Sequence, residues 1–321
     1  RDALWHPTPG FMRGAALAGI VANVCIVVSG GGVRLSQSGL GCSTWPRCTG
    51  TSLTPTHQTG IPTVNMLIEF SNRVFTFVVL AVAVLCVWTA LRLSPRRRSL
   101  IGLALLLPLG VVVQAVLGGV TVLTKLSPGM VAAHFLVSMG LVAAAVALHT
   151  RSSEGDGPAL QLVRPELRVL GRCVVAVVFV QLAIGTVVTG TGPHAGDASS
   201  PRFPFGIEQV AQLHADAGWV LVGLSFALLF ALRLTHAPAR LTRRTTELLV
   251  LELAQGLIGY VQYFLGVPAS LVAVHILGAT LVWVAAWRMV FAFRERAGLV
   301  APAPARTGTT GVMVTPSRPR H

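Results

Sequence analysis

Histidines recur at matching places in two parts of this chain. Gln114 precedes His134 by the same interval at which Gln255 precedes His275. The surrounding letters also match, with "QAVLGG" against "QGLIGY" and "MVAAHF" against "LVAVHI". An imidazole inside an apolar segment is costly to keep, so a duplicated one indicates a bound cofactor.

Two further polar positions complete the pattern. Asn72 precedes His134, and His214 precedes His275, by nearly equal intervals. The sequence therefore predicts two halves, each with two such positions, of which three are histidine and one is asparagine. We expect the four side chains to lie at similar depth in the outer half of the membrane.

The composition is that of a protein that crosses a membrane several times. Hydrophobic residues make up 53% of the chain and charged residues 11%, with a mean hydropathy of +0.71. A soluble domain carries about 25% charged residues. A membrane span needs roughly 20 apolar residues. Eight stretches are long enough, namely 12–33, 64–91, 99–123, 130–149, 168–190, 208–234, 246–266 and 269–292.

These stretches predict an all-α membrane protein with eight transmembrane helices. We expect residues 12–149 and 168–292 to form two tandem-repeated four-helix bundles, joined by a cytoplasmic linker over 150–167. Each repeat has an even number of spans, so an axis along the membrane normal relates the two. The end of the chain is rich in Pro, Thr and Ala, which predicts a disordered cytoplasmic tail over 293–321.

The net charge of +14 follows the membrane topology and does not indicate a nucleic-acid partner. Arginines gather after the second, fourth, sixth and eighth stretches, whereas the other loops carry few. This positive-inside pattern places both termini in the cytoplasm and suits contact with anionic lipids of the bilayer. We expect a multi-pass protein of the cell membrane. The first stretch lacks a small-residue cleavage site, so we expect no cleavable signal peptide.

The second half offers a pair of metal ligands. Two imidazoles from neighbouring helices, His214 and His275, are able to supply both axial ligands of a haem iron. A structural hydrogen-bonding role for the two histidines is the alternative, and zinc or copper is a weaker one because no third ligand is evident. In the first half Asn72 is a poor iron ligand. That site would hold iron through His134 alone, with an open position that suits oxygen chemistry, or that half has lost its cofactor.

An acidic residue distinguishes the two halves. Glu69 lies one turn before Asn72, and Ala211 stands at the corresponding place in the second half. A carboxylate inside a span is expensive and usually functional, so Glu69 is a candidate for proton transfer or for stabilising a cationic intermediate. The alternative is an ion pair with Arg73 or Arg34. The asymmetry predicts one catalytic site and one electron-transfer site.

The first outer loop is longer than its counterpart and carries two cysteines. Cys42 and Cys48 lie on the oxidising side of the membrane, where their spacing allows a disulfide. The pair is either a structural staple or a redox-active group. Arg34 and Arg73 lie near the same face and are candidates to pair with haem propionates, although interfacial arginines also occur without such a role.

The motifs together resemble one family. "SGLGCSTWPRCTG", "IEFSNR", "AAHFLVS", "QLHADAGW" and "AVHILGA", in this order on eight spans, are similar to haem A synthase over residues 12–292. The resemblance implies oxidation of the C8 methyl group of haem O to a formyl group, giving haem A for terminal oxidases. It also implies two four-helix bundles, with haem b in the C-terminal half and the substrate haem in the N-terminal half.

The resemblance assigns a role to each motif residue. His214 and His275 would ligate haem b, His134 would be a ligand in the substrate site, and Glu69 would be the catalytic acid. Cys42 and Cys48 would be the paired cysteines of the outer loop. The departure is Asn72, where the family pattern has histidine, and this places two-histidine ligation of the substrate haem in doubt.

The implied reaction is two successive hydroxylations that give a hydrated aldehyde, which then loses water. The implied partners are haem O, handed over by haem O synthase, and an electron donor that the sequence does not identify. One alternative function is a non-catalytic di-haem membrane cytochrome that only carries electrons. A second is a transporter built from repeats, which would need more polar residues in its spans.

Overall fold

The computed structural model describes residues 6–296, which form eight long helices and one very small sheet. The elements are α1 (Pro9–Leu35), α2 (Thr63–Arg92), α3 (Arg98–Leu123), α4 (Pro128–Ser152), β1 (Leu160–Gln161), α5 (Pro165–Thr191), α6 (Ile207–Leu234), α7 (Ala239–Phe264), α8 (Ala269–Ala292) and β2 (Arg294–Glu295). Each of the eight predicted stretches corresponds to one helix, so the all-α prediction is confirmed.

Inside a bilayer the backbone N–H and C=O groups must find hydrogen-bond partners within the protein, and an α-helix provides them within a single segment. Long helices therefore dominate in a chain this apolar. Proline marks where several of them begin. Pro9, Pro128 and Pro165 occupy the first turns of α1, α4 and α5. Proline suits this place because its missing N–H would find no partner within the helix there. The Thr8 side chain also caps α1, accepting a hydrogen bond from the Phe11 N–H.

Seven of the eight helices have the length and apolar composition of membrane spans, and α7 is the exception within residues 6–296. The protein is therefore a multi-pass membrane protein. The sequence predicts a span over 246–266, whereas α7 begins at Ala239. Its first turns contain Arg240, Arg243 and Arg244, which are good helix formers. Within the predicted span, Glu247, Glu252, Gln255 and Gln262 lower the hydropathy of the helix.

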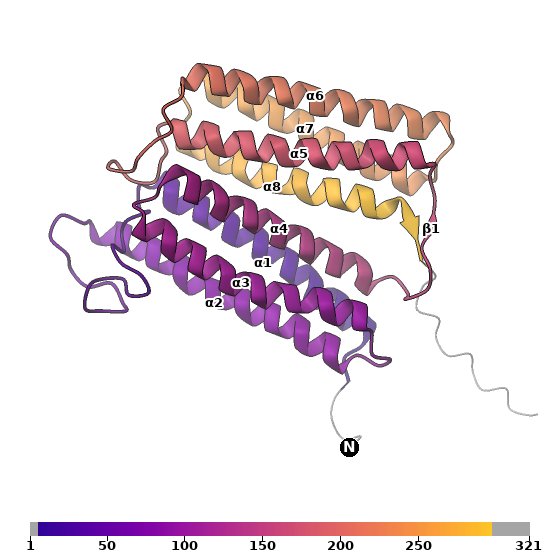
Figure 1. Cartoon of the computed structure of the whole chain (residues 1–321), viewed down its shortest axis with the longest axis horizontal. Coiled ribbons are helices and arrows are strands. Elements are labelled where there is room, and N and C mark those ends of the chain that lie inside the picture. Colours follow the sequence, from indigo (N-terminus) through magenta and orange to yellow (C-terminus); the bar gives the residue numbers. More distant parts are fainter. Residues whose placement is uncertain (1–5, 297–321) are drawn as a thin grey trace, which may run out of the picture.

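The helices pack in two groups. In α1–α4 each helix packs on its neighbours in sequence, and α1 also contacts α4; α5–α8 repeat these pairings, with α5 against α8. Figure 1 shows α5–α8, coloured red to yellow, above α1–α4, coloured indigo to magenta. The groups meet through α1, α4, α5 and α8.

Close backbone approach and one buried hydrogen bond join the two groups. The indole N–H of Trp283 on α8 donates to the Met139 carbonyl on α4 at 2.7 Å. At Gly31 on α1, an added Cβ would lie 2.8 Å from the side chain of Ile276 on α8, so a larger residue would require that side chain to move. Ile276 follows His275 directly, and this contact therefore supports the helix segment that carries the histidine.

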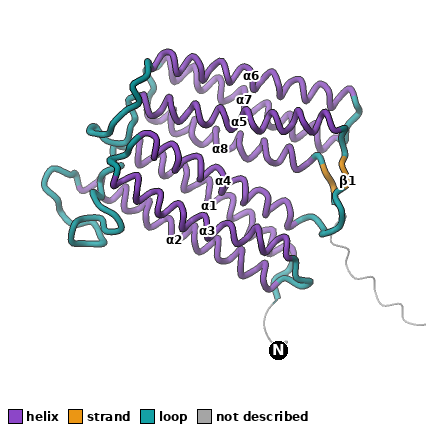
Figure 2. Tube along the Cα trace, viewed as in Figure 1, coloured by secondary structure: helices purple, strands orange, loops and turns teal. Residues whose placement is uncertain are grey.

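The two ends of the molecule differ. The loops α1–α2 and α5–α6 lie at one end, and the loops α2–α3, α4–α5 and α6–α7 at the other, as the teal segments of Figure 2 show. The second end is the one where the arginines gather. There Arg97 binds Asp156, with 2.9 Å between Nε and Oδ2, and Arg151 binds Glu154 at 2.8 Å.

The predicted linker and the segment after α8 pair with each other. Within the predicted linker 150–167, Leu160 and Gln161 pair as β1 with Glu295 and Arg294 of β2. The predicted tail over 293–321 includes Arg294 and Glu295, which form β2 in the structure. The pairing joins the linker to the segment after α8, and local composition does not reveal a contact between segments so far apart in the chain. Residues 297–321 of the predicted tail lie outside the described residues.

Candidate functional site

The four predicted ligand positions lie on helices that stand diagonally opposite within their groups. α2 and α4 each pack against α1 and α3, and α6 and α8 each pack against α5 and α7. Asn72, His134, His214 and His275 all lie within about the first three turns of these helices. All four therefore lie toward the end of the molecule that carries the cysteine loop.

The structure brings His214 and His275 together. Their ring centres are 6.2 Å apart and the rings are inclined by 67°. Two imidazoles on opposite sides of one metal atom, with bonds of about 2 Å, have ring centres about 6 Å apart. The Nδ1 atoms of both rings are buried without a hydrogen-bond partner in the described part of the chain. Both observations fit a metal-centred cofactor held between α6 and α8.

Each histidine is supported by a glutamine and a glycine from the preceding helix. The side-chain amide of Gln181 on α5 donates to the His214 carbonyl at 2.9 Å, and that of Gln114 on α3 donates to the His134 carbonyl at 3.0 Å. One turn after each glutamine stands Gly185 or Gly118. A Cβ there would lie 3.2 Å and 3.4 Å, respectively, from the histidine ring.

The third member of this motif is Gln255, with Gly259 one turn later on α7. A Cβ at Gly259 would lie 3.7 Å from the His275 ring, and the Gln255 amide lies against Gly278 of α8. The repeated Gln-x-x-(Leu/Ile)-Gly motif is visible in the sequence, but the sequence does not show which contacts it makes. The structure gives the motif one task in three places, which is to seat a histidine-bearing helix closely on its neighbour.

The first half is built differently at Asn72. The Ser29 hydroxyl on α1 donates to Asn72 Oδ1 at 2.7 Å, so this amide oxygen is satisfied by the protein itself. His134 keeps the features of the other two histidines, with a buried Nδ1 that lacks a partner within residues 6–296. The donor set of this half therefore fits ligation from α4 alone.

Glu69 is 5% exposed and both of its oxygens are engaged. Arg73 Nη2 donates to Oε1 at 2.6 Å, and the Cys42 backbone N–H donates to Oε2, also at 2.6 Å. Arg73 itself donates to the carbonyls of Cys42 and Thr44. Of the two ion pairs considered for Glu69, the structure contains the one with Arg73. The carboxylate and Arg73 together tie the cysteine loop to α2.

The cysteine loop lies against the first half. Cys42 and Cys48 are joined by a disulfide, as predicted, and both residues are 0% exposed. The ring of Trp45 fills the place where a side chain at Gly119 would project, next to the Gly118 that faces His134. Thiol exchange requires access to sulfur, so the burial favours the structural staple over a redox-active pair.

Arg34 belongs to the contact between the halves. Its Nε donates to the His194 carbonyl at 2.6 Å and its Nη2 to the Thr189 carbonyl at 2.9 Å, both in the second half. The guanidinium thus joins α1 to the α5–α6 segment. These contacts give Arg34 a structural task, which the sequence did not reveal because the partners lie in the other half of the chain.

Sequence reasoning missed a second buried carboxylate. Glu252 on α7 is 5% exposed, and its Oε1 accepts a hydrogen bond from the Ser225 hydroxyl on α6 at 2.8 Å. Its Oε2 has no partner in the described part of the chain. The signal was a single acidic letter in the apolar run "LLVLELA". An acidic residue inside a span is a functional candidate by default.

The arrangement as a whole provides paired imidazoles in one half and a single imidazole under a stapled loop in the other. Within residues 6–296, no group of three or more His, Cys, Asp and Glu side chains is placed to hold a metal ion.

The sequence was compared with those of known protein families and known proteins. Residues 14–287 match the model of COX15-CtaA, described as cytochrome oxidase assembly protein. Relatives named "Heme A synthase" are 36% identical over 140 residues in Lysinibacillus sphaericus, 31% over 140 residues in Halalkalibacterium halodurans and 31% over 153 residues in an Exiguobacterium species. These alignments cover 43%, 43% and 47% of this chain. The chain spans 44%, 45% and 48% of the relatives' own lengths, somewhat less than half of each.

Proposed function

The chain belongs to the COX15-CtaA family of cytochrome oxidase assembly proteins, and from this premise we propose that it is a haem A synthase. The enzyme would be an oxidoreductase that converts the C8 methyl group of haem O to a formyl group by successive hydroxylation. The observation that carries the proposal is the family match over residues 14–287. The name of the relatives, "Heme A synthase", supports it.

The site geometry supports a division of labour between the halves. His214 and His275, with ring centres 6.2 Å apart, would hold haem b from α6 and α8. When bound, haem b supplies one-electron transfer. The supporting residues Gln181 and Gly185 fix the position of the His214 ring, because a ligand must be orientated before it binds a metal.

The first half would bind the substrate haem O. His134 would be its ligand from α4, with Asn72 engaged by Ser29 and therefore not competing for the metal. The cysteine loop, held by Glu69 and Arg73, would cover the substrate and exclude water. In this assignment Glu69 acts on turnover by positioning the loop, a role that its two short contacts support more directly than proton transfer to substrate.

The membrane arrangement belongs to the same proposal. Residues 12–149 and 168–292 would be tandem repeats related by an axis along the membrane normal, with both termini in the cytoplasm of a cell-membrane protein. The haem sites and the cysteine loop would then face the extracytoplasmic side. Haem O would arrive from haem O synthase, and a separate electron donor would reduce the protein.

Pigment analysis tests this function. The protein would be purified from cells that make haem O, and its extracted haems would be identified by chromatography and mass. Haem B together with haem A, in a culture where cells lacking this chain make none, is the expected result. Haem B alone would favour the electron-carrying cytochrome, and a protein without haem would reopen the transporter alternative.

A further inference from the structure

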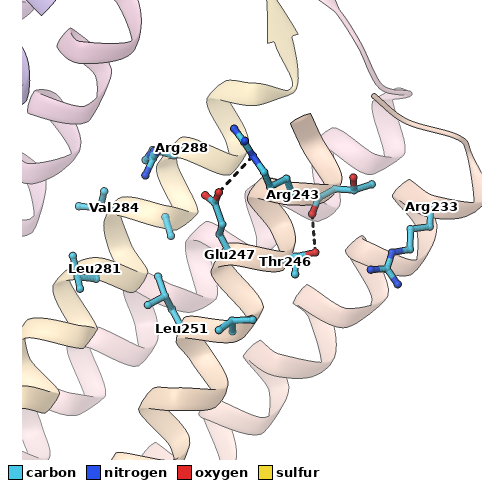
Figure 3. Close-up of a pocket in the computed structure, with 11 residues that line it drawn as sticks. Arg233, Arg243, Thr246, Glu247, Leu251, Leu281, Val284 and Arg288 are labelled. Carbon is cyan, nitrogen blue, oxygen red and sulfur yellow. Dashed lines mark hydrogen bonds and ion pairs between the residues drawn. The ribbon is translucent and has the colours of Figure 1, made fainter. Parts of the chain in front are cut away.

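A pocket of about 660 Å³ opens between α6, α7 and α8 at the arginine-rich end of the second helix group. Figure 3 shows Arg233, Arg243 and Arg288 around it, from three different helices. Its deeper wall is apolar and includes Leu251, Leu281 and Val284. The volume is in the range of small-molecule sites, about 300–1,000 Å³. None of these residues belongs to the proposed haem sites.

The pocket carries an excess of positive charge. Glu247 is paired with Arg244 at 2.6 Å and more loosely with Arg243 at 3.6 Å. Among residues 6–296, the side chains of Arg233 and Arg288 make no hydrogen bond or ion pair that would neutralise them. The charges that act on Arg288 are Arg244, Glu247 and Arg243. The carboxylate of Glu247 therefore lies among four arginines, namely Arg233, Arg243, Arg244 and Arg288. The resulting net positive charge makes the site complementary to an anion.

The first helix group shows that this charge is not needed for the fold. When the two halves are aligned on their Gln and His positions, Gly102 stands in place of Arg243, Leu106 in place of Glu247 and Ala147 in place of Arg288. In that group Arg97 and Arg151, at the same end, are neutralised because both bind Asp156. Charged residues at the positions of Arg243, Glu247 and Arg288 thus distinguish the second group from the first.

The position of the pocket in the membrane identifies the kind of anion. Arg233 lies at the end of α6, Arg243 near the start of α7 and Arg288 one turn before the end of α8, which is the level of lipid headgroups. Leu281 and Val284 lie earlier on α8, toward the hydrocarbon. Basic pockets between membrane helices at this level bind anionic headgroups. We propose that the pocket binds an anionic phospholipid, with its phosphate at the three arginines and an acyl chain along the apolar wall.

Lipid binding to the purified protein tests the proposal. The intact protein in neutral detergent would be titrated with phosphatidylglycerol or phosphatidylcholine, and bound lipids would be counted by native mass spectrometry. The expected result is preferential retention of phosphatidylglycerol. Equal retention of both lipids by the wild-type protein would overturn the proposal without any variant being needed.

Matched variants locate the site. Replacing Arg233, Arg243 and Arg288 together by Gln should weaken phosphatidylglycerol binding about 100-fold, from the usual contribution of each arginine near a membrane surface. The control removes the same charge from the same end of the first group by replacing Arg92, Arg96 and Arg98 with Gln, and should bind as the wild type does. Equal losses in both variants would mean general surface charge and not a site.

Two further arms separate a lipid from a free anion. Leu281→Trp would fill the apolar wall and leave the arginines in place, so it should weaken phosphatidylglycerol binding while the haem spectrum and melting temperature stay unchanged. Millimolar inorganic phosphate should not displace the lipid. Displacement by phosphate together with normal lipid binding in Leu281→Trp would show a simple phosphate site and overturn the lipid assignment.

Discussion

Among the described residues, each helix group buries one carboxylate within its helices, and the two carboxylates occupy different places. Glu69 lies near the loop end of α2, where Ala211 stands in the second group, and Glu252 lies in the middle of α7, where Val111 stands in the first. Glu69 is held by a guanidinium and a backbone N–H, whereas Glu252 has one hydroxyl donor.

The two helix groups share some features and differ in others, and the comparison shows what the shared helix arrangement does. The Gln-x-x-(Leu/Ile)-Gly motif and the histidine that it seats occur in both groups. The loop staple and Glu69 belong to the first, and the close pair of histidines belongs to the second. The common frame positions imidazoles. In the proposed function, the differences decide whether a haem would have two histidine ligands or would lie beneath the cysteine loop.

Removing a histidine should have the largest effect and should separate the groups. His214→Ala or His275→Ala is expected to abolish haem B binding, because each variant deletes one of the two proposed axial ligands. His134→Ala should keep haem B and lose haem O conversion. Reduced-minus-oxidised absorbance spectra and pigment extraction measure both. Loss of haem B in all three variants would show that the groups do not hold separate haems.

Glu69→Ala should weaken the attachment of the cysteine loop in the first helix group and leave the second group unchanged. Breaking a buried ion pair costs about 3–5 kcal/mol, and the lower end applies because the Arg73 side chain is 21% exposed. The expected result is faster alkylation of Cys42 and Cys48 after mild reduction, reduced turnover and unchanged haem B. Arg73→Gln serves as the matched control, since it frees the same loop while keeping the carboxylate.

The outcome also decides how Glu69 acts. If turnover falls in step with loop protection in both variants, Glu69 is a positioning residue. A Glu69→Gln protein with a fully protected disulfide and no turnover would instead show that the carboxylate acts on the substrate itself.

The sequence predicted the helices and the histidines because both depend on local pattern. Apolar runs long enough to span a membrane leave few alternatives to a helix, and duplicated histidines are visible as letters. The partners of Glu69 were not predictable in the same way. Its contact with the Cys42 N–H depends on the path of the loop that separates the two positions, and no periodicity describes such a path.

The contacts of Glu252 and of Arg34 were missed for a related reason. Glu252 sits in an apolar run without a charged neighbour, and its partner Ser225 comes from another helix. The position of Arg34 made it a candidate propionate partner, and the hydrogen bonds that it makes to carbonyls of the second group were not visible in the sequence. Contacts between helices distant in the sequence require the packing arrangement, which one sequence does not specify.

The polar pair of the second group can be replaced by the apolar pair of the first. Ser225→Ala alone should cost about 1–3 kcal/mol, because it leaves a buried carboxylate without its donor. The double variant Ser225→Ala with Glu252→Val, which copies Ala83 and Val111, should recover most of that loss. Thermal unfolding in detergent measures the cycle. A double variant as unstable as Ser225→Ala would mean that the pair contributes more to stability than the hydrogen bond between its two members.

The smallest expected effect concerns the linker that joins the groups. Hydrogen bonding from Arg97 lowers the pKa of the Asp156 carboxyl below its ordinary value. A carboxyl whose pKa is lower in the folded state stabilises that state above its unfolded pKa of about 3.9. The contribution is lost as the pH falls through the lower, folded value. The Asp156 side chain is 48% exposed, so screening by solvent keeps the effect small.

The comparison of wild type with Asp156→Asn isolates this contribution. The two proteins should differ in melting temperature at pH 7, with the wild type more stable, and the difference should shrink as the pH falls below about 4. Glu166→Gln, a change of equal charge at the start of α5, controls for the loss of an acidic group. A difference that persists unchanged at the lowest pH would show that Asp156 does not stabilise the protein through its charge.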